Sequence, residues 1–138
     1  MTVGRVLALD PGERRVGVAV SDPLHMIAQP VGTIDPKKDL EGSVQNLITQ
    51  WEVERVIVGL PVRLDGGEGA AAEGARRFAD VVAAACSIPV EMYDERFSTV
   101  VAERVMIEGG ARRRVRRERR DSVAAAVFLQ GWLDRDRR

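Results

Sequence analysis

The stretch RVLALDPGERRVGVAVS, residues 5–21, decides the fold. Its first six residues form an apolar run that ends in a carboxylate, Asp10, and the Pro11-Gly12 pair that follows is a turn signal. After the turn, valines recur at every second position, the period of a β-strand with one apolar face; they are Val16, Val18 and Val20. The stretch therefore predicts a buried strand, a hairpin turn and a second strand.

Outward from this hairpin, the hydrophobic period alternates between that of strands and that of helices. Further strands are predicted over residues 27–34, 55–60 and 88–94, and helices over residues 39–51, 71–86, 98–107 and from about 116 to 134. Three antiparallel strands followed by strands joined through helical crossovers imply an α/β fold. The prediction is a mixed five-stranded central sheet flanked by helices.

Length and composition narrow the class of protein. The 138 residues suit one domain covering residues 1–138, with enough chain to bury a core. One cysteine and one histidine, His25, can form neither a disulfide nor a zinc site, and we expect a reducing, cytoplasmic setting. We predict that His25 is a surface residue without an evident partner. No apolar run approaches a membrane span and no signal peptide is recognisable, so we expect no membrane partner.

The charges are balanced in number but not in position. The chain has 21 basic and 21 acidic residues, yet residues 112–120 contain seven arginines and one glutamate. Arginine suits bidentate contact with phosphate, so this segment predicts contact with nucleic acid. A solvated helix start would give the same pattern, and the sequence leaves both interpretations open.

Acidic residues stand at the ends of two predicted strands. Asp10 ends the first, and Asp94-Glu95 closes the strand over residues 88–94. A carboxylate buried in such a place costs several kcal/mol unless it is compensated. Alternation along the strand points Asp94 and Glu95 to opposite faces of the sheet.

A third acid, Asp121, is predicted on the last helix. Its helical phase places it on one face with apolar residues further along the helix, namely Ala125, Phe128 and Trp132. Asp121 is therefore expected to face the sheet. Converging carboxylates could bind Mg²⁺ or Mn²⁺, but each acid could equally cap a turn or pair with an arginine.

Four blocks of the sequence carry a family resemblance. They are ALDPGERRVGVAVSD (residues 8–22), VIVGLP followed by DGGEG (56–69), DERFSTVVAE (94–103) and RDSVAAAVFLQGWLD (120–134). Together they closely resemble the YqgF/RuvX family. The resemblance implies a ribonuclease H-like fold and a bacterial cytoplasmic enzyme, a nuclease that hydrolyses phosphodiester bonds.

The resemblance also implies a set of functional residues. Asp10, Glu95 and Asp121 would be catalytic and would bind one or two Mg²⁺ or Mn²⁺ ions, with Asp94 as an alternative to Glu95. By the same resemblance, Arg14, Arg15 and Arg96 are expected to contact nucleic acid. The charge of the arginine-rich segment separately predicts such contact for Arg112, Arg113, Arg114, Arg116 and Arg117.

Three functions remain open at this level. The resemblance favours processing of the 5′ end of pre-16S rRNA, with the ribosomal small subunit as a possible partner. A Holliday junction resolvase acting on branched or single-stranded DNA is the alternative within the same class, and the protein would be a monomer or a homodimer. A non-catalytic nucleic-acid or ribosome-binding module is the alternative of another class, although clustered acids beside a phosphate track would not help a pure binder.

Overall fold

A computed structural model describes residues 4–12, 14–61, 67–94 and 113–135, with the backbone alone for residues 113–119. Within these residues, one mixed sheet has the strand order β3-β2-β1-β4-β5. Its strands are β1 (Arg5–Pro11), β2 (Val16–Ser21), β3 (Ala28–Ile34), β4 (Val53–Leu60) and β5 (Val90–Asp94). β1, β2 and β3 are successively antiparallel, whereas β1, β4 and β5 run parallel. The predicted mixed sheet is confirmed.

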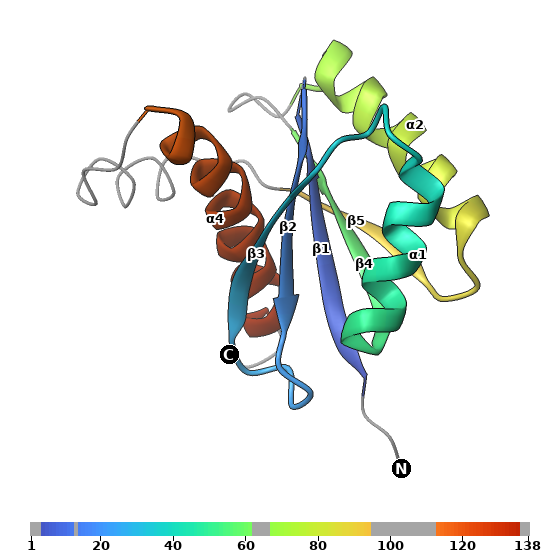
Figure 1. Ribbon diagram of the computed structural model, residues 1–138, viewed down its shortest axis with the longest axis vertical. Coiled ribbons are helices and arrows are strands. Elements are labelled where there is room, and N and C mark those ends of the chain that lie inside the picture. The colour runs from blue at the N-terminus through green and yellow to red at the C-terminus, as the bar shows by residue number, and fades with distance from the viewer. Residues whose placement is uncertain (1–3, 13, 62–66, 95–112, 136–138) are drawn as a thin grey trace.

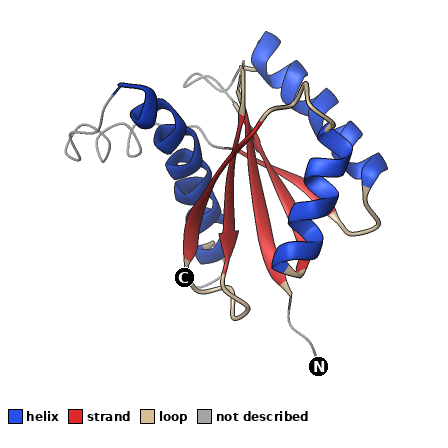
Figure 2. Cartoon of the chain, viewed as in Figure 1, coloured by secondary structure: helices blue, strands red, loops and turns tan. Residues whose placement is uncertain are grey.

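Helices cover both faces of this sheet (Figures 1 and 2). The described helices are α1 (Leu40–Trp51), α2 (Ala70–Ala85) and α4 (Arg113–Asp134). α1 and α2 lie on one face and α4 lies on the other (Figure 1). Each face has its own apolar cluster, one containing Leu7, Val44 and Val82 and the other containing Ala8, Phe128 and Leu129. No helix among the described residues is long and apolar enough to cross a membrane.

Local signals account for most of the element boundaries. Asp39 caps α1, because its side chain accepts a hydrogen bond from the Gly42 N–H at 3.2 Å. β5 begins at Val90 rather than at residue 88, since Pro89 has no N–H to donate, although its carbonyl still accepts from Val56. α4 begins three residues before the predicted start. The helix predicted over residues 98–107 lies outside the described residues.

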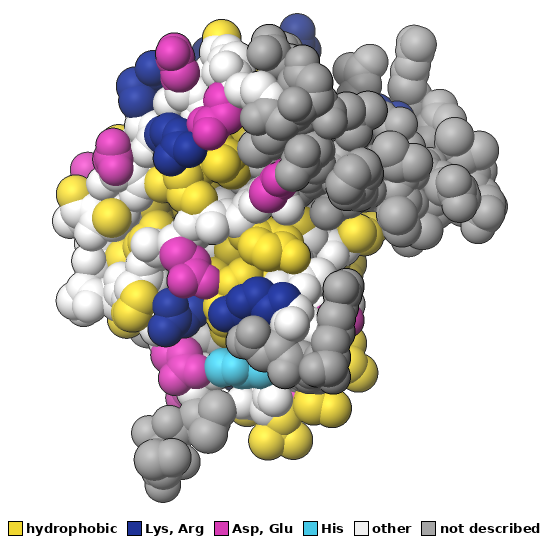
Figure 3. Space-filling model, turned by 180° about the vertical axis from the view of Figure 1, so that it is seen from behind, with side chains coloured by type: hydrophobic (Ala, Val, Ile, Leu, Met, Phe, Trp, Pro, Cys, Tyr) yellow, Lys and Arg dark blue, Asp and Glu magenta, His cyan; other side chains and the backbone are white. Residues whose placement is uncertain are grey.

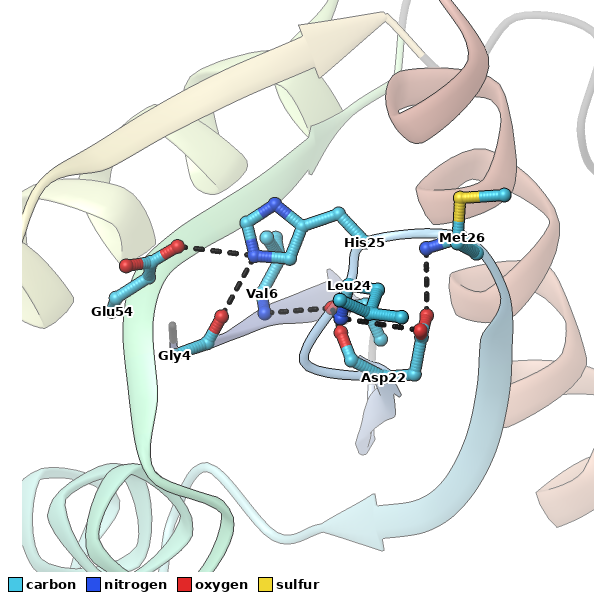
Figure 4. A network of polar contacts seen from close by, with 8 residues as sticks. Gly4, Val6, Asp22, Leu24, His25, Met26 and Glu54 are labelled. Atoms are coloured by element: carbon cyan, nitrogen blue, oxygen red, sulfur yellow. Dashed lines mark hydrogen bonds and ion pairs between the residues drawn. The ribbon is translucent and has the colours of Figure 1, made fainter. Parts of the chain in front are cut away.

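Polar contacts close the sheet edge at which β1 begins (Figure 4). The Asp22 carboxylate accepts hydrogen bonds from the backbone N–H groups of Leu24 at 3.2 Å, Met26 at 2.7 Å and Ile27 at 2.8 Å. These bonds fold the chain between β2 and β3 into a tight loop. The loop residue His25 has a positive φ of 57°.

The prediction that His25 lacks a partner is wrong. Its Nε2 lies 2.7 Å from the Gly4 carbonyl oxygen and 3.0 Å from Glu54 Oε1 (Figure 4). The side chain is still partly exposed, and Figure 3 shows it in cyan at the surface beside acidic and basic groups. Glu54 is far from His25 in the sequence, so only the pairing of strands brings them together.

Candidate active site

Asp10 lies near the end of β1, on the face that α4 covers. Val6 and Ala8 pack in the cluster against α4. Leu7 and Leu9 pack in the other cluster, toward α1 and α2. Because strand side chains alternate between faces, half-buried Asp10 belongs to the α4 face with Val6 and Ala8.

Gly17 on β2 brings α4 against the sheet beside Asp10. Asp10 and Gly17 are paired across β1 and β2, so their Cα atoms are about 5 Å apart. A Cβ atom at position 17 would overlap the backbone carbonyl of Asp121, and the glycine therefore permits this approach. Asp121 of α4 therefore lies directly beside the pair of strands, β1 and β2, that carries Asp10.

Arg15 joins this acidic group from the hairpin between β1 and β2. Its Nε lies 3.0 Å from Asp121 Oδ2, and the two side chains are 26% and 34% exposed. The Gly12 N–H donates to the Arg15 carbonyl at 3.0 Å and closes the turn. Arg14, the other arginine of the hairpin, is exposed. Arg15 thus places a positive charge against a carboxylate at the sheet edge.

The strands β4 and β5 have residues that line up with Asp10 across the sheet. Leu9 pairs with Val58, and Gly59 pairs with Tyr93. Asp10, Gly59 and Tyr93 therefore lie at one level across the three parallel strands. Because Gly59 has no side chain, β4 presents no side chain between Asp10 on β1 and Tyr93 on β5.

Asp94 falls on the opposite face from Asp10. Met92 packs in the cluster against α1 and α2, whereas Tyr93 packs against the α4 cluster. By alternation, half-buried Asp94 belongs with Met92. Position 95 is the next that an alternating strand would direct to the α4 face, and Glu95 lies outside the described residues.

The structure thus brings together part of the predicted site. Asp10 and the backbone of Asp121 both lie beside Gly17, and Arg15 pairs with Asp121. Asp94 belongs to the other face. The described residues alone contain no group of three potential metal ligands. Predicted residues that lie outside the described chain are Glu95, Arg96 and Arg112, and only the backbone in α4 is described for Arg113, Arg114, Arg116 and Arg117.

Sequence reasoning missed two features of this site. A glycine inside a strand signals close approach of another backbone, so the VGVAV pattern around Gly17 carried a usable signal. The pairing of Arg15 with Asp121 had no such local signal, because the two residues come from elements that are distant in the sequence.

The donor chemistry fits a divalent cation. Asp10 and Asp121 offer carboxylate oxygens, the ligands that Mg²⁺ and Mn²⁺ prefer. They come from a strand and a helix held together by the buried contact at Gly17, so their spacing depends on the packed fold rather than on a loop. The neighbouring Arg15 adds a cation suited to binding phosphate.

Solved structures show which fold this chain has. “T. thermophilus RuvC in complex with Holliday junction substrate” has a TM-score of 0.52 and 20% identity, covering 96% of this chain and 94% of that chain. The Fowlpox virus resolvase, solved with “substrate Holliday junction DNA”, has a TM-score of 0.57 and 12% identity, covering 95% and 97%. The chain has the ribonuclease H-like fold of these resolvases, as predicted.

Sequence comparison narrows this class to one family. Residues 4–135 match the family described as “RuvX: Holliday junction resolvase”. A Halothermothrix orenii protein is 46% identical over 133 residues, covering 94% of both chains, and a Myxococcus xanthus protein is 44% identical over 136 residues, covering 96% of this chain and 89% of its own. Both are named “Putative pre-16S rRNA nuclease”.

The chain belongs to the RuvX family. The resemblance seen in the four sequence blocks is confirmed. The expectation of a hydrolase that acts on phosphodiester bonds is confirmed with it.

Proposed function

We propose that this protein is a metal-dependent nuclease that processes the 5′ end of pre-16S rRNA during ribosome biogenesis. The observation that carries the proposal is the packing of α4 on β2 at Gly17, which brings Asp121 beside the strand pair that carries Asp10. This site lies where the parallel strands β1, β4 and β5 end, the edge at which open α/β sheets bind ligands. The names of the relatives support RNA as the substrate.

Asp10 and Asp121 would bind one or two Mg²⁺ or Mn²⁺ ions, with Glu95 as the third ligand. We propose Glu95 rather than Asp94 because Asp94, two residues after Met92 on β5, lies on the same face of the sheet as Met92, away from α4. When bound, such ions activate water and stabilise the leaving oxygen of a phosphodiester. Arg15 holds Asp121 in position and adds a positive charge beside the substrate phosphate.

The arginine-rich segment supports a polyanionic partner. Arginines from residue 113 onward occupy the first turns of α4, where the first turn contains no acidic residue. Arginine in the first turn of a helix opposes the helix dipole, so helix stability alone does not favour it there. Contact with phosphates would give these arginines a role, alongside Arg14 and Arg96.

A second candidate function is resolution of four-way DNA junctions. The family description favours it, and two structural neighbours were solved with such junctions. A resolvase must cut two strands, which requires a homodimer, whereas a monomer suffices to trim RNA. For either function we propose that residues 1–138 act as one domain in the cytoplasm, and for RNA processing that the small ribosomal subunit is a partner.

Cleavage assays on matched RNA, single-stranded DNA and four-way junctions, with Mg²⁺ or Mn²⁺, test this proposal. The expected result is metal-dependent cleavage of RNA carrying the 5′ end of pre-16S rRNA, which Asp10→Asn abolishes. Cleavage of the junction alone would replace RNA processing with the resolvase function. Binding without cleavage under every condition would overturn the nuclease and favour a binding module.

A further inference from the structure

A pocket of about 340 Å³ opens at the same edge of the sheet as Asp10, but on the face that α2 covers. Pro11 and Gly12, which directly follow Asp10, form one side, and Pro61 continues it after the end of β4. The first half of α2 forms the other side with Ala71, Gly74 and Phe78. Asp10 is therefore followed directly by Pro11, the first residue of β1 that lines the pocket.

The walls of this pocket suit a flat, uncharged group. All nine of the described residues that line it are apolar or glycine, and three of them are prolines. The Phe78 ring packs against the buried core cluster, so one wall has firm support. Among the described residues outside the backbone of its own helix, a Cβ atom at Gly74 would meet only the Arg77 side chain at 3.9 Å, so this position leaves space. A cavity of this size and lining accommodates a small aromatic ligand.

The surroundings favour part of a nucleic acid as that ligand. Asp10, Arg15 and exposed Arg14 lie next to the pocket along the chain and supply the groups that handle a sugar-phosphate backbone. Side chains of adjacent strand residues point to opposite faces, so a strand lying over the edge could present a phosphate on the α4 side and its base on the α2 side.

We propose that this pocket receives one unpaired nucleobase of the strand bound at Asp10. A base inside a duplex is stacked and inaccessible, so the occupant must be single-stranded or turned out of its helix. The pocket would then favour cleavage next to an unpaired nucleotide. This inference rests on the proposed nuclease function, and adds a base-binding subsite to it.

The chain offers a matched pair of variants for the test. Ala71 and Ala83 are both exposed residues of α2, but only Ala71 lines the pocket. Ala71→Leu should obstruct the pocket, while Ala83→Leu makes the same change elsewhere on the helix. Phe78→Leu keeps an apolar side chain and removes the aromatic ring. Melting temperatures would establish that each variant is folded.

Fluorescence anisotropy would measure the binding of single-stranded RNA and DNA oligonucleotides in which each nucleotide in turn is abasic. We expect one abasic position to weaken binding to the wild type about tenfold, the scale of one base stacked on an aromatic side chain. Ala71→Leu should weaken binding of the intact strand to a similar extent and no longer respond to that abasic position. Ala83→Leu should behave as the wild type.

If the wild type binds all the abasic oligonucleotides equally well (a flat scan), the subsite is refuted. Equal binding by the Ala71→Leu and Ala83→Leu variants would also refute it. If Ala71→Leu fails to fold, the wild-type scan and Phe78→Leu decide the matter. Because the assay measures binding, it separates the two proposals. A protein that responds to one abasic position but never cleaves refutes the nuclease, and one that cleaves with a flat scan refutes the subsite.

Discussion

The two ends of the central sheet use acidic residues in different ways. At the edge where β1 begins, Asp22 accepts hydrogen bonds from three backbone N–H groups of its own loop. At the edge where β1 ends, Asp121 comes from a helix distant in the sequence, packs beside the strand pair that carries Asp10, and lies against Arg15. Asp22 binds its local backbone, whereas tertiary packing brings Asp121 close to the strand pair that carries Asp10.

This difference is the basis for proposing a functional rather than a structural role for Asp10 and Asp121. Backbone donors, that of Ile27 foremost, hold the pKa of Asp22 below its ordinary value, which links this carboxylate to stability. The acids at the opposite edge, Asp10 and Asp121, come from elements that are distant in the sequence. Bringing like charges from separate elements together costs free energy unless positive charge offsets their repulsion. Arg15 supplies part of that charge, and we propose that a divalent cation supplies the rest.

The largest effect is expected from Asp10→Asn. The substitution keeps the size of the side chain and removes the charge proposed to bind metal, so cleavage should fall by about a thousandfold or more. The melting temperature should remain at or above that of the wild type, because repulsion between acids decreases. Initial rates and thermal unfolding would be measured on the same sample. Wild-type rates in this variant would remove Asp10 from the site.

Gly17→Ala should damage both activity and stability. The added methyl group would overlap the backbone carbonyl of Asp121 and push α4 from the sheet, at a cost of about 1–3 kcal/mol in the free energy of unfolding. Gly131→Ala is the matched control, because a methyl group there meets Tyr93 only at an ordinary 3.5 Å. Equal denaturation midpoints for the two variants would show that the approach at Gly17 is not needed.

Neutralising three arginines within residues 113–117 should weaken binding of nucleic acid without regard to sequence. The slope of log K against log salt concentration should flatten by about 0.7 to 0.9 for each arginine that no longer binds a phosphate. Titrations at several salt concentrations would provide the slope. If it does not change, the segment is a solvated helix start.

The smallest effect is expected from Asp22→Asn, which should lower the free energy of unfolding by about 1–2 kcal/mol and leave cleavage intact at low temperature. Because the folded-state pKa of Asp22 is lowered, its contribution is present above the unfolded pKa and is lost as the pH falls through the folded value. Denaturant unfolding from neutral to acidic pH would follow this. A stability difference that persists at low pH would contradict the assignment.

Local patterns predicted most of the fold and part of the site. The hairpin around Pro11-Gly12 and the cap at Asp39 depend on neighbouring residues alone. The alternation that places Asp10 on its face of the sheet is equally local. Contacts between distant elements were not available in this way. The pairing of Arg15 with Asp121 and that of His25 with Glu54 depend on how strands and helices pack, which no sequence period encodes.

The central claim is that carboxylates at the end of β1 and on α4 bind a divalent cation together. The most direct test is the rise in melting temperature caused by saturating Mn²⁺, measured for the wild type, Asp10→Asn, Asp121→Ala and Asp22→Asn. A ligand that binds only the folded state should raise this temperature by about 5 °C or more. The account predicts that the wild type and Asp22→Asn show the full rise, and that Asp10→Asn and Asp121→Ala lose most of it. An equal rise in all four proteins, or none in the wild type, would contradict the claim.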